Sequence, residues 1–415
     1  MTLEQQVTVL RQQFPALARQ HRRQPVVYLD GPAGTQVPQR VIDAISDYLS
    51  HRNANHGGLF PTSLESDAML DKAHRAAADL LAADDPDCVY FGPNMTTLTF
   101  ALSRALSKTW KPGDEVLVTR LDHDANVTPW VLAAQDAGAT IRYVDFHHED
   151  CTLDMEDFRA KLSDKTRLVA VGCASNSTGS VNPVREICAA AREVGALSFL
   201  DAVHHAPHAL IDVTEFGCDF LACSAYKFFG PHVGMVWGRR DLLENLTPYK
   251  LRPATDALPG KWMTGTQNHE CIAGVLAAID YLADLGRDVA SNQALDRRSA
   301  LVASYQAVGE YERTLVTKLL AGLQANDEVK IWGIADPARF DNRLPTVSIT
   351  HKRLSASQIA QQLGDVGIFV WHGNYYALQI TETLGLEPDG MVRIGLVHYN
   401  TEEEIDRLLQ ALNSL

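Results

Sequence analysis

The stretch that decides the fold is Cys223-Ser224-Ala225-Tyr226-Lys227-Phe228-Phe229-Gly230-Pro231. It lies between two apolar runs, residues 220–222 and 233–237, which we expect to form buried strands. Lys227 would then lie at a strand end, where partial desolvation disfavours its ammonium form. An amine with a lowered pKa is a nucleophile that forms Schiff bases with carbonyl compounds. The simpler alternative is a loop lysine between two core strands, because the pattern is short.

A second group supports the functional interpretation of Lys227. Asp201 ends the apolar run 196–200 and lies 26 residues before the lysine. An acid at the carboxyl end of a buried strand faces the crevice where open α/β sheets bind ligands. Pyridoxal phosphate needs both groups, since a carboxylate keeps its pyridine nitrogen protonated and a lysine holds its aldehyde. Asp201 alone could instead cap a following helix.

The composition is that of a large globular chain. Its 415 residues are 46% hydrophobic and 21% charged, and no low-complexity or Pro/Gly/Ser-rich segment divides them, so we expect two closely packed domains. The net charge of −14 argues against a nucleic-acid partner, because such binding rests on clustered lysine and arginine. The seven cysteines lack the close spacing of a zinc site, so we expect neither a metal site nor a disulfide framework.

We expect the protein to be cytoplasmic. Residues 1–20 carry Glu4, Arg11 and Arg19 among their apolar positions, so they lack the uninterrupted apolar core of a signal peptide. No stretch approaches the ~20 apolar residues needed to span a bilayer. We therefore expect no membrane partner.

Short apolar runs alternate with helical patterns along most of the chain. The expected strands are residues 88–91, 115–119, 141–144, 168–171 and the run from 196 that ends at Asp201, and amphipathic helices separate them. Repeated βα units with short apolar strands predict an α/β fold with a mostly parallel sheet covered on both faces. This sheet should form a large cofactor-binding domain over residues 25–290.

A smaller α+β domain is expected from residues 1–24 and 291–415. A helical stretch at 272–285 runs into a long helical pattern over 288–323 that should bridge the two domains. Beyond it, strand-like segments alternate with helical ones at 346–349, 355–363, 368–371, 392–396 and 402–412.

In combination, the motifs resemble those of the class V aminotransferase group of fold-type I pyridoxal phosphate enzymes. Within that group they resemble the cysteine desulfurase-like branch, which also holds selenocysteine lyases. The resemblance runs from Tyr28-Leu29-Asp30-Gly31-Pro32-Ala33-Gly34 to Tyr399-Asn400-Thr401-Glu402-Glu403. It implies the fold-type I architecture, pyridoxal 5'-phosphate as cofactor, a small-molecule amino-acid substrate and a homodimer.

A phosphate site is expected directly after the strand that ends at Phe91. The turn at residues 92–97 should open a helix, whose N-terminus offers backbone donors and partial positive charge. Similarity to the family puts Met95 and Thr96 at this site, with hydroxyls from Ser224 and Tyr226. The family more often has histidine where Tyr226 stands. By itself the turn could be a plain helix cap.

The resemblance assigns three residues to the cofactor ring. His123 matches the family's ring-stacking histidine, and an imidazole there can also move protons at the substrate Cα. Asn176 falls where related enzymes place an amide beside the ring hydroxyl. His204 stands where many relatives carry glutamine, and either side chain can donate a hydrogen bond to that oxygen.

Two further residues are assigned to the substrate and to the dimer. Arg393 lies inside a strand-like segment, where its guanidinium needs an anion, and it matches the family's arginine for the substrate carboxylate. A structural ion pair is the alternative. Thr266 lies in a segment that resembles the one reaching the neighbouring subunit's phosphate, which implies a homodimer.

The loop at residues 370–377 departs from the nearer desulfurases. They have here an arginine, a glycine, two histidines and the cysteine that takes sulfur as a persulfide. This chain has Trp371 in place of the arginine and Tyr376 in place of the cysteine, and no cysteine follows Cys271. We therefore expect Tyr376 to shape the substrate pocket or to donate a proton.

These observations predict a pyridoxal phosphate-dependent lyase or transferase. In the leading interpretation, Lys227 holds the cofactor and then acts as acid and base at Cα, while Asp201 supports the ring. A C–S bond of a cysteine-type substrate is then cleaved without a protein persulfide. The alternatives are transamination or epimerisation of an amino acid or amine, and a protein that binds the cofactor without turnover.

Overall fold

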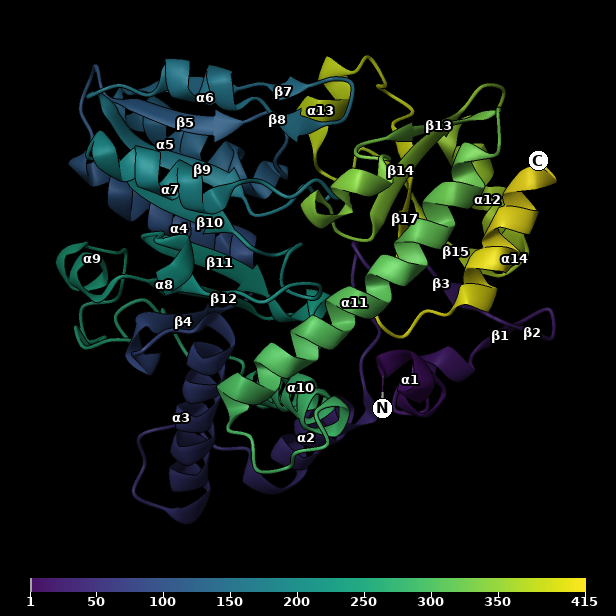
Figure 1. The fold of residues 1–415 in the computed structure, drawn as a ribbon. Coiled ribbons are helices and arrows are strands. Elements are labelled where there is room, and N and C mark those ends of the chain that lie inside the picture. The colour runs from purple at the N-terminus through teal and green to yellow at the C-terminus, as the bar shows by residue number, and fades with distance from the viewer. Residues whose placement is uncertain (1) are drawn as a thin grey trace.

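A computed structural model describes residues 2–415 and shows two sheets connected by the long helix α11 (Arg297–Gln324) (Figure 1). The larger sheet has the order β4-β12-β11-β10-β9-β5-β6. In that order, the strands are Val89–Gly92, Gly234–Gly238, Phe220–Ser224, Leu197–Asp201, Thr166–Gly172, Glu115–Thr119 and Thr140–Val144. Strands β11, β10, β9, β5 and β6 are parallel, whereas β12 is antiparallel to both its neighbours. The predicted α/β fold with a mostly parallel sheet is confirmed.

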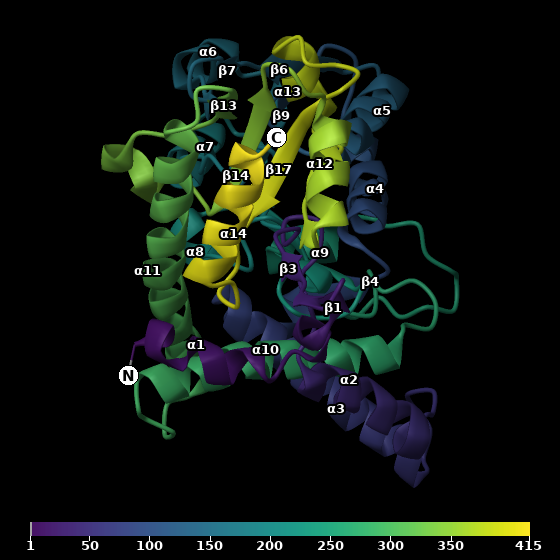
Figure 2. The same ribbon diagram turned by 90° about the vertical axis from the view of Figure 1, so that its right-hand side faces the viewer.

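Both faces of this sheet are buried. Leu168 and Ala170 of β9 pack in one apolar cluster, whereas Val169 and Val171 pack in another. Successive side chains of a strand point to opposite faces, so an uninterrupted apolar run needs cover on both sides. Helices α4 and α5 cover one face and α6 and α7 the other (Figure 2). These helices are Met95–Leu106, Thr128–Ala137, Met155–Lys161 and Val184–Glu193.

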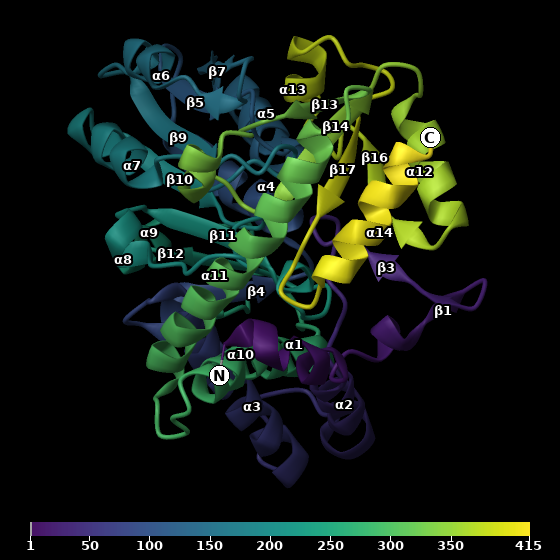
Figure 3. The same cartoon turned by 45° about the vertical axis from the view of Figure 1, so that its right-hand side comes forward.

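The smaller sheet is antiparallel, with the order β13-β14-β17-β16. Its strands are Val329–Trp332, Thr346–His351, Met391–Gly395 and Trp371–Gly373. Helices α11, α12 (Ala356–Asp365) and α14 (Glu402–Asn413) lie over it (Figure 3). This is the smaller α+β part that the sequence predicts.

The N-terminal segment lies against the C-terminal part of the chain. Strand β3 (Val27–Tyr28) pairs in parallel with β15 (Ile368–Phe369). Arg11, the last residue of α1 (Leu3–Arg11), donates a hydrogen bond of 2.8 Å to Glu404. The division into domains of residues 25–290 and of 1–24 with 291–415 stays a prediction.

The remaining elements are short strands and peripheral helices. They are β1 (Gln20–His21), β2 (Gln24–Pro25), β7 (Phe146–His147), β8 (Thr152–Leu153), α2 (Gln39–Asp47), α3 (Pro61–Leu81), α8 (Val213–Phe216), α9 (Arg240–Asn245) and α13 (Leu378–Thr383). Within residues 2–415, none of the helices combines the length and apolar character that crossing a membrane requires.

The helix expected to begin at residue 288 begins instead at Arg297. Helix α10 (His269–Val289) ends first, and Ser291 adopts a left-handed φ of 51°. Asp296 then caps α11, because its carboxylate accepts a hydrogen bond of 2.8 Å from the Ser299 N–H. A cap inside a continuous helical pattern therefore divides it into two helices.

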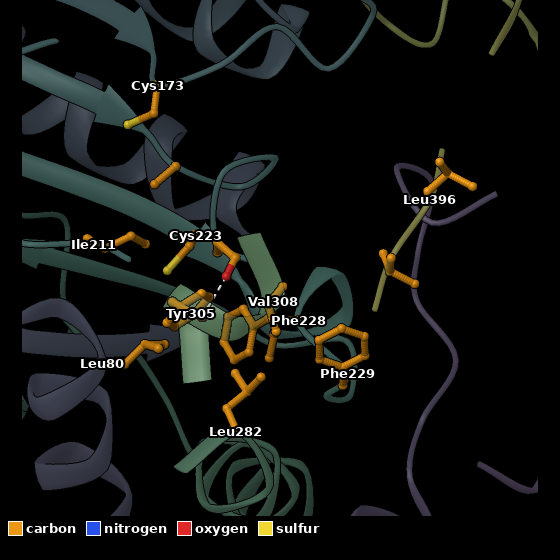
Figure 4. Packing of buried hydrophobic residues seen from close by; sticks show 14 of the residues in the cluster. Leu80, Cys173, Ile211, Cys223, Phe228, Phe229, Leu282, Tyr305, Val308 and Leu396 are labelled. Carbon is orange, nitrogen blue, oxygen red and sulfur yellow. Dashed lines mark hydrogen bonds between the residues drawn. The ribbon is translucent and has the colours of Figure 1, made fainter. Parts of the chain in front are cut away.

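A core beneath the lysine loop joins the large sheet to helices α10 and α11 (Figure 4). Phe228 and Phe229, directly after Lys227, are fully buried in it with Leu282 of α10 and Tyr305 of α11. Each buried aromatic ring removes a large apolar surface from water. The loop that carries the lysine is therefore held by the packing between the sheet and the helices.

The backbones of helices α10 and α11 lie close together at Gly286, where an added Cβ would overlap the backbone carbonyl of Ala300. Gly286→Ala is expected to lower the free energy of unfolding by about 1–3 kcal/mol, because the backbones must separate. Gly309→Ala on α11 is the matched control, since a Cβ there meets nothing within 4 Å. It should be neutral or stabilising by up to ~1 kcal/mol. Urea denaturation of both variants tests the close approach of the two helices. Equal free energies of unfolding for the two variants would contradict it.

Candidate active site

A cavity of about 470 Å³ is lined by residues from both sheets. It lies at the carboxyl end of β10, the location at which open α/β sheets bind ligands. Its volume is in the range of small-molecule sites. The residues predicted from the sequence that line it are Met95, Thr96, His123, Asn176, Asp201, His204, Tyr226, Lys227, Tyr376 and Arg393. Ser224 and Thr266 do not line it.

Lys227 lies on a single turn of helix, Ala225–Lys227, between strands β11 and β12. Its ammonium donates a hydrogen bond to the carbonyl of Pro32 and lies 4.8 Å from the centre of the Tyr226 ring. Burial lowers the pKa of Lys227 to about 7, and the positive charge of Arg393 adds to the effect while Asp201 opposes it. The strand-end placement and desolvation expected from the sequence are both present.

Asp201 ends β10 and is buried, with one carboxylate oxygen accepting a hydrogen bond of 2.9 Å from the Val203 N–H. Burial raises its pKa to about 6, against the lowering effects of the Val203 N–H and Lys227. A second carboxyl, Asp122, also lines the cavity and accepts a hydrogen bond of 2.7 Å from the Gly172 N–H. Burial and the nearby Asp201 raise the pKa of Asp122 to about 8. The sequence interpretation missed Asp122, although it directly precedes His123.

His123 presents its ring to the cavity beside Tyr376. The two rings are stacked, with centres 5.7 Å apart and planes inclined by 25°. The Nδ1 atom of His123 accepts a hydrogen bond of 3.0 Å from the Ala125 N–H. Burial lowers the pKa of His123 to about 4, helped by the positive charges of Lys227 and Arg393. The imidazole is therefore neutral at physiological pH.

Arg393 crosses from β17 to the loop after β9. Its Nη1 donates a hydrogen bond of 2.8 Å to the Asn176 carbonyl, and its guanidinium lies 4.2 Å from the centre of the Tyr375 ring. Its Nε has no partner among residues 2–415. Burial lowers its pKa to about 10. A buried guanidinium with an unused donor is suited to an anionic ligand.

The predicted phosphate site lies at the N-terminus of α4. Asn94 caps this helix by accepting a hydrogen bond of 2.8 Å from the Thr97 N–H. Ser224 lies behind the cavity wall, where its hydroxyl accepts a bond of 3.4 Å from the Met95 N–H. The structure thus brings Met95, Thr96 and Ser224 together, with the exposed end of the helix facing the cavity.

Thr266 lies apart from the other predicted residues. It borders a separate hollow that Pro93 and His232 also line. Within one chain, the structure does not bring Thr266 to the cavity.

His204 belongs to a buried polar group that the sequence interpretation missed. Its ring centre lies 5.6 Å from that of His208, whose Nδ1 lies 2.8 Å from a carboxylate oxygen of Glu312 on α11. The Nε2 of His204 has no partner within residues 2–415, and burial lowers the pKa of His204 well below its usual value. The spacing of His204 and His208 was the available signal. In the described part of the chain, no group of His, Cys, Asp or Glu side chains could hold a metal ion.

Comparisons with known proteins identify the family of this chain. Residues 27–408 match the family described as Aminotransferase class-V. The chain is 31% identical to the aminotransferase-like protein FGM3 of Gibberella zeae, over 97% of this chain and 96% of that protein. It is 32% identical to a probable cysteine desulfurase of Streptomyces coelicolor, over 97% and 95%. The apo structure of the cysteine desulfurase from Thermococcus onnurineus NA1 is similar, with a TM-score of 0.87 and 24% identity over 98% of this chain and 97% of that chain.

The fold is that of the fold-type I pyridoxal phosphate-dependent enzymes. The family match covers nearly the whole chain, so the chain belongs to the class V aminotransferase family. The family and fold class predicted from the motifs are therefore confirmed. The roles of the individual site residues stay predictions.

The residues of the cavity fit pyridoxal phosphate. The buried Asp201 carboxylate suits a protonated pyridine nitrogen, and the N-terminus of α4 suits a phosphate. Asn176 and His204 both line the cavity. The Oδ1 atom of Asn176 and the Nε2 atom of His204 are buried without hydrogen-bond partners among residues 2–415. Buried polar atoms without partners are costly, so they indicate a polar ligand.

In protein prepared without cofactor, the Lys227 amine is expected to titrate near pH 7, as its lowered pKa requires. Above that pH it is neutral and reactive, whereas exposed lysines become so only near their pKa of about 10.4. Competitive acetylation across a pH series, followed by peptide mapping, measures the midpoint. Asp201→Asn should lower this midpoint and Arg393→Gln should raise it, because they remove opposite charges. A midpoint equal to that of exposed lysines would contradict the burial of the amine.

Proposed function

We propose that this enzyme cleaves a C–S bond of a cysteine-type amino acid without storing sulfur on a protein thiol. The observation that carries the proposal is a cavity that combines Lys227, Asp201 and Arg393 but has no cysteine in its lining. The cofactor chemistry is thus supported, while the sulfur-accepting group of the nearer desulfurases is replaced by Tyr376.

In this proposal, the cofactor is bound by residues that line the cavity and by Ser224, which lies behind the cavity wall next to Met95. Lys227 holds the cofactor aldehyde, Asp201 the pyridine nitrogen, and Met95, Thr96, Ser224 and Tyr226 the phosphate. His123, Asn176 and His204 contact the ring. When bound, pyridoxal phosphate supplies an electron sink for the charge left at the substrate Cα.

The substrate is held and deprotonated by two residues. Arg393 binds its carboxylate, for which the unused Nε and the planar guanidinium are suited. Lys227 would take the Cα proton. Its pKa of about 7 lies near the operating pH, where a group can both accept and return a proton efficiently.

The cysteines do not offer an alternative persulfide site. Six of the seven are buried, and Cys271 is partly exposed at the start of α10. Burial raises the pKa values of Cys88 and Cys151 to about 12 and that of Cys223 further. Since the thiolate is the form that attacks sulfur, these thiols are poorly suited to accept it.

Transamination or epimerisation is the second candidate function. The sequence identity of 31% to an aminotransferase-like protein over nearly the whole chain favours it. Neither reaction needs a thiol, and the same Lys227, Asp201 and Arg393 would serve both. Release of an amino group to an acceptor acid, with no sulfur product, would distinguish transamination.

We also propose that the enzyme is a homodimer in the cytoplasm, in which Thr266 reaches the partner's phosphate site. Thr266 is remote from the cavity of its own chain. Leu59, Phe60 and Leu64, at the start of α3, are 96%, 52% and 54% exposed. Large exposed apolar side chains grouped in this way favour burial against another protein surface.

Borohydride reduction of the cofactor-loaded enzyme is expected to label Lys227 and no other lysine. Lys227 alone combines a lowered pKa with a position on the cavity wall. Peptide mapping locates the label, and Lys227→Ala should lose both the label and the yellow colour. Label at another lysine would overturn the assignment.

Incubation with cysteine is expected to leave all seven thiols without an added sulfur atom. Any sulfur released should appear as a diffusible product, because no thiol lines the cavity. Alkylation followed by mass spectrometry checks each cysteine, with pyruvate, alanine, sulfide and keto acids measured in the same samples. Pyruvate with sulfide supports the lyase, and alanine with a stoichiometric persulfide would return the protein to the persulfide-forming class. Tyr376→Cys is the matched variant, since it restores a thiol at the position in question.

A further inference from the structure

The outer wall of the cavity is aromatic on the side of the small sheet. Trp371 of β16 is paired directly with Arg393 of β17 in the antiparallel ladder. Directly opposite residues share a face and lie about 4.5–5.5 Å apart at Cβ. The indole therefore stands beside the guanidinium that faces the cavity, and both residues line it.

A second aromatic wall comes from Tyr375 and Tyr376. Both have left-handed backbones, with φ of 57° and 59°, which side chains other than glycine rarely adopt. The loop is held in this form by the Asp124 N–H, which donates to the Tyr376 carbonyl at 2.6 Å, and by Asn374, which accepts from the Tyr376 N–H at 3.1 Å. Unusual backbone held by several contacts is typical of functional sites.

The two outer rings are accessible. Trp371 is 52% exposed and Tyr376 is 74% exposed, although both lie on the cavity wall. One face of the Tyr376 ring is stacked on His123, so the remainder is free to contact a ligand. Aromatic side chains placed this way bind rings by stacking or edge contacts.

Four residues with carboxyl, ammonium or guanidinium groups line the cavity: Asp122, Asp201, Lys227 and Arg393. The outer wall adds no further group of these kinds, only the imidazole of His372. A substrate side chain that passes Arg393 therefore meets mainly aromatic rings. An ammonium at its end would find no carboxylate there, and a carboxylate would find no lysine or arginine.

From this arrangement we propose that the substrate is an amino acid whose side chain ends in an aromatic ring, bound between Trp371 and Tyr376. This rests on the proposed function for its chemistry. With C–S cleavage, the substrate is a cysteine whose sulfur carries an aryl or arylmethyl group. Its Cα proton goes to Lys227, and the C–S bond breaks with its electron pair leaving on sulfur. With water, the products are the aromatic thiol, pyruvate and ammonium.

Binding of phenylalanine and alanine tests the substrate class separately from the reaction, because neither has sulfur to lose. Titration of the cofactor-loaded enzyme, followed by its absorption spectrum and by calorimetry, should show phenylalanine bound about tenfold more tightly or better. Trp371→Ala and Tyr376→Ala should each remove most of this preference, and Tyr376→Phe should keep it. Leu378→Ala is the control, since Leu378 is exposed near the same loop but does not line the cavity.

Equal binding of phenylalanine and alanine, or an unchanged preference in Tyr376→Ala, would overturn the proposal. Tighter binding of lysine than of phenylalanine would overturn it too, because the rings would then hold a cation. If phenylalanine binds as expected but S-benzylcysteine releases no thiol, the aromatic site stands and C–S cleavage does not. If S-benzylcysteine is cleaved no better than S-methylcysteine and phenylalanine binds no more tightly than alanine, C–S cleavage stands and the aromatic site does not.

Discussion

Two cations buried in one cavity set the conditions for the rest of the site. Lys227 and Arg393 are both removed from water, and burial lowers the pKa of each. Uncompensated buried charge is costly, so such a cavity needs anions. Asp201 supplies one carboxylate. The carboxylate of a ligand at Arg393 would supply another, so the cavity is suited to a ligand that carries a carboxylate.

The fold keeps these charges in place through packing between distant parts of the chain. Lys227 lies on the turn between β11 and β12, and the buried rings of Phe228 and Phe229 anchor that turn to helices α10 and α11 (Figure 4). Arg393 is carried by the other sheet and donates to the Asn176 carbonyl across the cavity. The site therefore exists only when the two sheets are held together, which the connecting helix α11 and the segment around β3 promote.

Membership of the class V family and the loop at residues 370–377 bear on different properties of the enzyme. The family accounts for the fold and for the cofactor chemistry. The fate of the substrate depends on groups that approach its side chain, and in the proposed complex those groups are Trp371 and Tyr376, which line the cavity. One fold hosts several reactions in this way, because specificity belongs to the site and not to the scaffold.

The sequence by itself determined the α/β class, the mostly parallel sheet and the positions of Lys227 and Asp201. These follow from local patterns, since an apolar run with a polar residue at its end predicts a buried strand and a residue at the sheet edge. The motifs also identified the family. Local patterns did not show that α10 would end at Val289 and that α11 would begin only after Asp296, because a cap is decided by one side-chain hydrogen bond.

Only the tertiary structure decided which distant side chains meet. Arg393 and Asn176 are 217 residues apart, and His208 and Glu312 are 104 apart, yet each pair forms a hydrogen bond. Tyr376 faces His123 through a loop with left-handed backbone that no local preference for tyrosine predicts. Such contacts depend on the packing of whole sheets and helices, whose combined burial outweighs the preference of any single residue.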